Sequence, residues 1–285
     1  MNKYIIVTES GSDLPENMVQ GYPIHVLPMH VIIEKDNYLD GALSIDELCD
    51  YYDQTGKVPT TSAVNPEQYL QAFEKIRLDY PDSVIIHISY SSEVSSTFQN
   101  AVIASDEIKN VFHVDALNVS AGLALIVMKA AKLIEMNPEI MPEELISHIK
   151  TYVDTTRFFF TPVNLEYLRA GGRVSNAQYL GASLLKIKPL IEIQRGKLIS
   201  TKKYRGSMKK VMGQMIGDFF SKFEIDKNEI FLIYLHKIDQ ELKERIENQV
   251  RALGVKEVVW LKGGCVITCH GGPNAIGIAG QEIVA

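Results

Sequence analysis

The chain lacks the features that mark secreted, membrane-spanning or nucleic-acid-binding proteins. Its 285 residues include only three cysteines, too few for a disulfide framework and typical of a reducing cytoplasm. Lysine and arginine total 29 against 35 acidic residues, and no basic block signals nucleic-acid binding. The uncharged run at 116–128 is shorter than the roughly 20 residues of a membrane-spanning helix. Residues 1–15 do not resemble a secretory signal. We therefore expect a cytoplasmic protein with no membrane span and no nucleic-acid partner.

Several signatures of nucleotide and acyl-transfer enzymes are also missing. No G-x-G-x-x-G follows a predicted strand, and no G-x-x-x-x-G-K-S/T phosphate loop occurs, so nucleotide binding has no support. No G-x-S-x-G elbow is present. The S-x-x-K pattern of serine acylases begins at Ser147, Ser183, Ser200 and Ser207 without its companion motifs, so these four matches carry no information.

The first half of the chain alternates short β-rich runs with helical periodicity. One helix is predicted to begin at Asn65-Pro66, where asparagine suits the cap and proline the first turn, and another near Ala121. Strands separated by helices predict a βαβ sheet with right-handed crossovers. The predicted strands are residues 4–8, 24–33, 84–89 and 111–115.

The second half has a less regular pattern. A buried strand is predicted at 158–160, and a hairpin over 189–203 turns at Arg195-Gly196. Helices and strands then alternate over 208–223, 229–235, 240–253 and 257–261, and the glycine-rich tail from Gly263 suggests closing strands. The change of pattern predicts two α/β domains: a parallel-sheet domain over 1–160 and a mixed-sheet domain over 161–285.

Two hydroxyl-rich segments lie beyond predicted strands, where ligands of open α/β sheets bind. Residues 91–97 (SSEVSST) follow one strand and open a helix, and residues 59–62 (PTTS) precede the Asn65-Pro66 helix. Helix capping alone explains part of each cluster, and a helix N-terminus also attracts an anion. Five hydroxyl side chains in seven residues exceed what capping needs. The two clusters together favour a site for one small acidic group.

Other candidate groups have both structural and functional interpretations. His270, in what we expect to be a glycine-rich turn, is either a structural hydrogen-bonding residue or a ligand contact. Cys265 and Cys269 lie beside it at a spacing that is not usual for zinc, so we expect no metal. Glu9 and Asp13 would repel an anion, and we expect them to hold loop amides or hydroxyls instead.

The sequence resembles the DegV family of bacterial fatty-acid-binding proteins over nearly its whole length. The family includes the binding subunits of fatty acid kinase. The segments that carry the resemblance are residues 6–10 with Asp13-Leu14, then 59–62, 91–97, 165–175, 186–191, 203–205, and 270–273 with Gly277. Three departures stand out: Glu9 where the family usually has Asp, residues 62–66 (SAVNP) in place of Ser-Gln-Pro, and Glu93 and Ser96 in place of glycines.

The resemblance implies a fold, a ligand and a partner. The fold is a three-layer α/β/α domain with a parallel sheet and a smaller α/β domain with a mixed sheet, and a long-chain fatty acid lies in a tunnel between them. The fatty acid is the only ligand implied, and no cofactor is. Arg205 matches a basic residue implied in engaging a separate ATP-dependent kinase, which forms the acyl phosphate for phospholipid synthesis. The fatty-acid-binding residues implied are Thr61, Ser62, Ser95, Ser96, Thr97 and His270.

A fatty-acid carrier without catalysis of its own is therefore the leading hypothesis. Burial of about ten methylenes supplies on the order of 8 kcal/mol before the costs of binding, so hydroxyls and amides need only orient the carboxylate. A hydrolase or transferase acting on a lipid acyl group is the alternative, with Ser95 as nucleophile and His270 as base, although spacing identifies no residue to orient the histidine. A lipid-sensing regulator is a third hypothesis.

Overall fold

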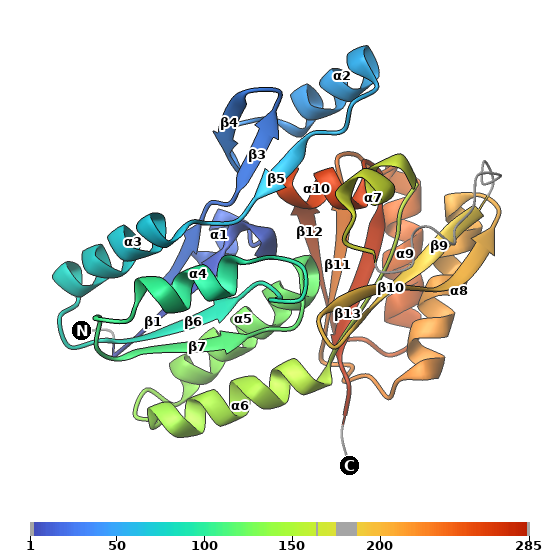
Figure 1. Cartoon of the computed structure of the whole chain (residues 1–285). Helices are drawn as coiled ribbons and strands as arrows, with labels where there is room; N and C mark the ends of the chain where they lie inside the picture. The colour runs from blue at the N-terminus through green and yellow to red at the C-terminus, as the bar shows by residue number, and fades with distance from the viewer. Residues whose placement is uncertain (1–2, 164, 175–186, 284–285) are drawn as a thin grey trace.

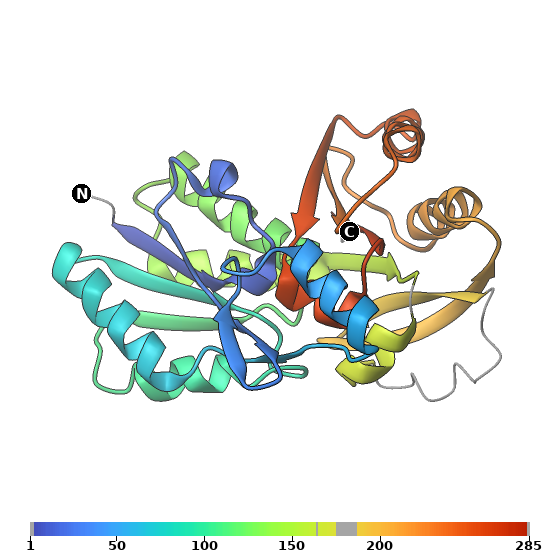
Figure 2. The same cartoon turned by 90° about the horizontal axis from the view of Figure 1, so that it is seen from above.

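The computed structural model describes residues 3–163, 165–174 and 187–283. Within them the strands form sheets of four, six and three strands (Figure 1). Seen from above, the four-stranded and six-stranded sheets lie side by side, and the three-stranded sheet lies across their junction (Figure 2). Of the sequence features discussed above, Ser175, Ser183 and Lys186 lie outside the described residues.

The four-stranded sheet is wholly parallel, in the order β2 (Ile24–Leu27), β1 (Tyr4–Glu9), β6 (Val84–Ser89) and β7 (Val111–Asp115). Tyr69 and Phe73 pack on one face with Ile5 and Val7, and Leu145 and Ile149 pack on the other with Ile6. This is the predicted three-layer α/β/α arrangement. The helices of the first face are α3 (Pro66–Asp79) and α4 (Thr97–Ala104), and those of the second are α5 (Ser120–Met136) and α6 (Pro142–Thr155). The short η1 (Ser10–Ser12) and α1 (Glu16–Val19) follow β1.

The six-stranded sheet is mixed, and only β11 and β12 pair in parallel. Its order is β10 (Lys197–Arg205), β9 (Ile187–Gln194), β8 (Thr156–Thr161), β13 (Ile276–Gln281), β11 (Glu229–Leu235) and β12 (Glu257–Gly263). Helices α8 (Met208–Lys222) and α9 (Gln240–Ala252) pack on one face through Phe219, Ile246 and Val250. The β9–β10 hairpin is confirmed, and its turn residues Arg195 and Gly196 both have positive φ, as in the turns that suit twisted hairpins.

Helix α5 joins the two larger sheets. It contacts β1 of the parallel sheet and β8, β11 and β13 of the mixed sheet. Eleven of its seventeen residues are buried, as expected for a helix that is apolar on every side. Lys132 on α5 donates to Glu229 on β11 at 2.6 Å. The domain boundary near residue 160 remains a prediction; β8, which spans it, lies wholly in the mixed sheet.

The three-stranded sheet corrects two of the predicted elements. The single strand expected at 24–33 is two strands, because Pro28 interrupts it: β2 joins the parallel sheet, and β3 (His30–Ile33) pairs with β4 (Asp36–Leu39). Thr60–Ser62, for which helix capping was one interpretation, is strand β5 and pairs with β3. Asn65 alone caps α3, through a capping box with Gln68. Helix α2 (Ile45–Thr55) lies between β4 and β5 in the chain.

A third predicted element, near the end of the chain, is also corrected. Residues 265–271, expected to contain a strand end and a glycine-rich turn, form α10 (Cys265–Gly271). The carboxylate of Asp40 accepts the backbone N–H of Cys265 at 3.1 Å and that of Val266 at 3.4 Å, so it satisfies the first amides of this helix. Helix α10 packs against α7 (Leu165–Gly171), α2 and β5 (Figure 1). It therefore carries His270 to the junction of the three sheets.

Candidate functional site

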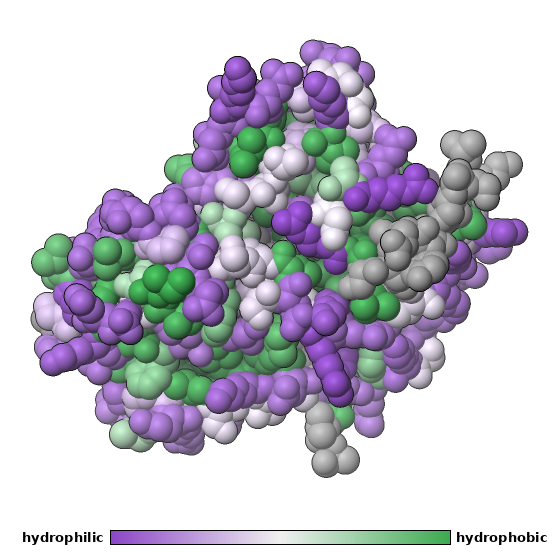
Figure 3. Space-filling view, viewed as in Figure 1, coloured by the Kyte–Doolittle hydropathy of each residue, from purple (hydrophilic) through white to green (hydrophobic). Residues whose placement is uncertain are grey.

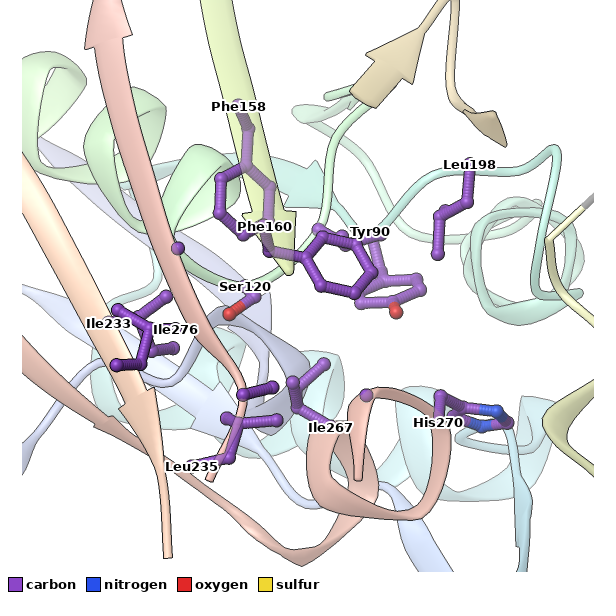
Figure 4. Close-up of a pocket in the computed structure, with 14 residues that line it drawn as sticks. Tyr90, Ser120, Phe158, Phe160, Leu198, Ile233, Leu235, Ile267, His270 and Ile276 are labelled. Atoms are coloured by element: carbon purple, nitrogen blue, oxygen red, sulfur yellow. The ribbon is translucent and has the colours of Figure 1, made fainter. Parts of the chain in front are cut away.

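An apolar cavity lies where α5 and α10 meet the mixed sheet (Figure 4). Phe158 and Phe160 of β8 project into it toward Tyr90, since alternate residues of a strand face the same side. The aliphatic wall consists of Ile233 and Leu235 of β11, Ile276 of β13 and Ile267 of α10.

A second cavity, called the polar cavity below, adjoins the first, and hydroxyl, basic and apolar side chains together line it. Tyr90, Leu198 and His270 line both, so the two share one wall. Residues of intermediate hydropathy occupy the middle of the face in Figure 3, where β5, α4 and the mixed sheet meet. An apolar chamber beside a hydroxyl-lined one suits a ligand with a long apolar part and a small polar end. The hydroxyls of the second cavity come from Thr61, Ser62, Ser95 and Ser96.

His270 and Thr61 are brought together, although 209 positions separate them in the chain. His270 Nε2 lies 2.8 Å from Thr61 Oγ1, and His270 Nδ1 is buried and has no hydrogen-bond partner among the described residues. Burial, and then the nearby Arg173, lower the pKa of His270 to about 4. The imidazole is therefore neutral at pH 7 and carries one N–H donor and one acceptor.

Ser95 and Ser96 lie immediately before α4 and line the polar cavity. Ser96 is the N-cap residue, but its side chain makes no capping hydrogen bond. Ser95 Oγ accepts the backbone N–H of Thr97 at 3.3 Å. The positive end of the helix dipole and the two hydroxyls thus face one cavity, an arrangement that favours an anion.

Thr97 does not accompany the other hydroxyl residues. It is buried, it is not among the residues that line the cavity, and its Oγ1 lies 2.9 Å from the hydroxyl of Tyr69. The reason is its place as the first residue of α4, where the side chain meets the buried cluster around Glu9. Thr97 thus lies apart from the other hydroxyls in this structure, and its expected contact with a fatty acid stays a prediction.

Tyr90 and Arg173 line the polar cavity but were not identified from the sequence as site residues. The Arg173 guanidinium donates to the carbonyl of Gly171 at 2.7 Å and to that of Val94 at 3.4 Å. No ion pair formed within residues 3–163, 165–174 and 187–283 includes Arg173. Its charge is thus available to an anion in the cavity. The sequence feature that could have identified Arg173 is its position directly after Gly171-Gly172, where a helix ends.

Arg205 lies apart from both cavities. It is the last residue of β10 and is exposed. A contact with a partner protein is compatible with this position and stays a prediction.

Glu9 holds an amide and hydroxyls, as predicted, within a buried polar cluster. Its carboxylate accepts the backbone N–H of Tyr90 at 2.8 Å, the hydroxyl of Tyr69, and a bond from His87 Nε2 at 2.6 Å. Burial raises the pKa of Glu9, but His87 and these hydrogen bonds outweigh it, so the net shift is downward. The backbone of Tyr90, a residue of the shared wall, is thus fixed by a buried carboxylate.

Asp13, at the edge of the apolar cavity, also holds a backbone amide and a hydroxyl, as predicted. Its carboxylate accepts the backbone N–H of Gly264 at 2.7 Å and the hydroxyl of Ser120, a cavity residue, at 2.5 Å. Burial raises the pKa of Asp13 from near 3.8 to about 8, and the two hydrogen bonds only partly oppose this. The carboxyl is therefore largely protonated in the folded protein at neutral pH.

The substitution Asp13→Asn is expected to stabilise the protein at alkaline pH relative to the wild type. Between the two pKa values the folded protein binds a proton that the unfolded chain has lost, so wild-type stability falls as pH rises from about 4 to 8. Asparagine keeps an acceptor for Gly264 and removes this dependence.

Chemical denaturation at the two ends of this range measures the effect. We expect the stability of Asp13→Asn minus that of the wild type to grow by several kcal/mol, about 5 for the full shift, between pH 4 and pH 8. Asp36→Asn, an exposed change on β4, serves as the control and should show no such growth. A constant difference for Asp13→Asn would contradict a buried, protonated carboxyl.

The cysteines near the site show no metal arrangement. Cys265 and Cys269 are buried on α10, and Cys265 Sγ donates to the carbonyl of Leu43 at 3.2 Å. Burial raises the pKa of the Cys265 thiol to about 12, so it stays protonated. In the described part of the chain, no group of three or more His, Cys, Asp or Glu side chains could hold a metal ion. There, too, no helix has both the length and the apolar character to cross a membrane.

Comparison with known proteins agrees with this geometry. A DegV domain-containing protein of Caldanaerobacter subterraneus subsp. tengcongensis is 31% identical over 287 residues, which cover 99% of this chain and 100% of the relative. A fatty acid-binding protein of Thermotoga maritima is 27% identical, with 99% and 98% covered.

Solved structures share the fold. The structure titled "Fatty Acid Binding of a DegV family Protein from Thermus thermophilus" superposes with a TM-score of 0.88 at 25% identity and covers 99% of this chain and 100% of that one. The model of the family described as "Uncharacterised protein, DegV family" matches residues 3–282. The chain therefore belongs to the DegV family.

Proposed function

We propose that the protein binds a long-chain fatty acid, with the acyl chain in the apolar cavity and the carboxylate in the polar one. The observation that carries the proposal is that Tyr90, Leu198 and His270 line both cavities. An acyl chain in the apolar cavity can therefore have its carboxylate in the polar one. The acyl chain supplies the affinity, at about 0.8 kcal/mol for each buried methylene. The fatty-acid-binding proteins of this family named above support the same ligand class.

The carboxylate would lie among Thr61, Ser62, Ser95 and Ser96, with His270 and Arg173 beside it. A buried carboxylate needs hydrogen-bond donors and a compensating charge. The hydroxyls and the neutral imidazole supply donors, and Arg173 supplies the charge. This arrangement orients the head group and leaves the chemistry to another protein.

We infer further that the bound acid is presented to a separate ATP-dependent fatty acid kinase in the cytoplasm, which forms the acyl phosphate for phospholipid synthesis. Arg205, exposed at the end of β10, is the proposed contact with that kinase. A structural neighbour with a TM-score of 0.85 and 18% identity, covering 99% of this chain and 100% of that one, is the Streptococcus pneumoniae Fatty Acid Kinase (Fak) B3 protein loaded with linoleic acid. Its fold supports a carrier of this type.

The alternative, a serine/histidine-dependent hydrolase or transferase acting on a lipid acyl group, has less support. His270 Nε2 faces Thr61, and no hydrogen bond between His270 and Ser95 forms within the described ranges. Catalysis by a serine also needs a group that orients the histidine, and no residue in the described part of the chain is hydrogen-bonded to His270 Nδ1. We therefore propose that the protein is not itself an enzyme.

The test begins with protein purified from a bacterial host. Denaturing extraction followed by mass spectrometry should release about one fatty acid per chain. Thr61→Val removes the hydroxyl at nearly constant size and should weaken fatty-acid binding by about tenfold, equivalent to 1.4 kcal/mol. Thr60→Val, on the same strand but outside the lining of both cavities, is the matched control. Absence of lipid together with no binding of added fatty acid would refute the proposal.

A further inference from the structure

Helix α7 ends against His270. Gly171, its last residue, is buried, and α7 and α10 lie side by side (Figure 1). A Cβ atom placed on Gly171 would lie 2.5 Å from His270 Nδ1 and 3.3 Å from His270 Cα. The first of these distances is shorter than the contacts that real Cβ atoms make. The imidazole of His270 therefore occupies the space that a side chain at position 171 would fill.

His270 has little freedom to yield this space. Its Nε2 lies 2.8 Å from Thr61 Oγ1, so rotation of the ring away from α7 would break that contact. Its backbone is part of α10, which Asp40 holds at the first turn. A side chain at position 171 would thus displace the imidazole from the wall shared by the two cavities.

Gly171 also contacts Arg173, the basic residue that lines the polar cavity. Its carbonyl accepts from the Arg173 guanidinium at 2.7 Å. The neighbouring Gly172 differs: it has a φ of +65°, and no atom lies within 4 Å of the place where its Cβ would be. The two glycines are therefore present for different reasons, steric at 171 and conformational at 172.

We propose that Gly171 is a positioning residue for the carboxylate end of the site: its missing side chain admits the imidazole of His270, and its carbonyl orients Arg173. This inference rests on the proposed function, because it assigns a ligand carboxylate to the cavity that these groups line. Gly171 itself touches no ligand. A substitution there should change recognition of the head group and leave recognition of the acyl chain unaltered.

The experiment compares a fatty acid with the fatty alcohol of the same chain. Gly171→Ala should weaken binding of the acid by about tenfold or more and that of the alcohol much less, since only the acid depends on the displaced donors. Gly172→Asn is the matched control, because asparagine tolerates positive φ and has open space there; it should leave both affinities unchanged. In a His270→Ala background, Gly171→Ala should have no further effect. Equal losses for acid and alcohol, or unchanged binding of the acid, would overturn the proposal.

A measurement without ligand separates this inference from the proposed function. In the wild type, burial and Arg173 lower the pKa of His270 to about 4. In Gly171→Ala the displaced imidazole should titrate nearer the ordinary value of a histidine, which NMR of the ring resonances detects. An unchanged titration would overturn the positioning role whatever the ligand. A shifted titration in a protein that binds no fatty acid would refute the proposed function and confine the inference to the placement of His270.

Discussion

Replacement of His87 by leucine is expected to destabilise the fold by about 3–5 kcal/mol, because it leaves the carboxylate of Glu9 buried without its imidazole partner. Both side chains are wholly inaccessible to solvent. His87 Nε2 lies 2.6 Å from Glu9, and its Nδ1 lies 2.9 Å from His113 Nδ1 on the next strand. Burial lowers the pKa of His113 to about 4, so this second ring is neutral and cannot replace the lost partner.

Denaturant titration of single and double variants tests this expectation. In a Glu9→Gln background no charge is left unpaired, so His87→Leu should cost only about 1–2 kcal/mol there. His148→Leu, on the exposed face of α6, is the control and should change stability by at most about 0.5 kcal/mol. An equal cost of His87→Leu in both backgrounds would show that the Glu9 charge is not the cause.

The substitution Ala275→Phe is expected to reduce fatty-acid affinity by roughly 50-fold. Ala275 is buried and lines the apolar cavity, and its carbonyl accepts from Leu235 at 2.9 Å, which fixes the backbone there. A phenyl ring would fill space that we assign to the acyl chain. Exclusion of three methylenes costs about 2.4 kcal/mol of binding, which corresponds to this factor.

Affinity measured against chain length checks the assignment. The loss should be large for a long-chain acid and small for an acid short enough to leave the filled region empty. Ala252→Phe, at the exposed end of α9, controls for the added hydrophobic surface. If Ala275→Phe weakened short and long acids equally, the acyl chain would not occupy this cavity.

Much of the fold was predictable because its strands and helices carry strong local signals. The apolar strand at Val84–Ser89 and the Arg195-Gly196 hairpin turn are confirmed. The missed elements depend on distant partners. Thr60–Ser62 is a strand because β3 supplies its hydrogen bonds, and α10 is rich in residues that favour strands, yet Asp40, more than 200 positions away, accepts its first amides.

The site was predictable in part for the same reason. The two hydroxyl-rich segments pointed to Thr61 and Ser95 as candidates, and the structure places both on one cavity with His270. The run of hydroxyl residues does not indicate which of its side chains faces the cavity, and that of Thr97 lies against Tyr69. Arg173 and Tyr90 were missed because their roles come from the approach of α7 to α10 and from the buried Glu9 carboxylate, which leave no local pattern.

The position of α5 limits how the molecule can open. If the parallel sheet separated from the mixed sheet, α5 would lose its contacts with one of them. Leucine, isoleucine and alanine side chains of that face would then be exposed to water. The contact of both sheets with α5 is therefore poorly suited to act as a hinge, and we expect a ligand to enter and leave without breaking it.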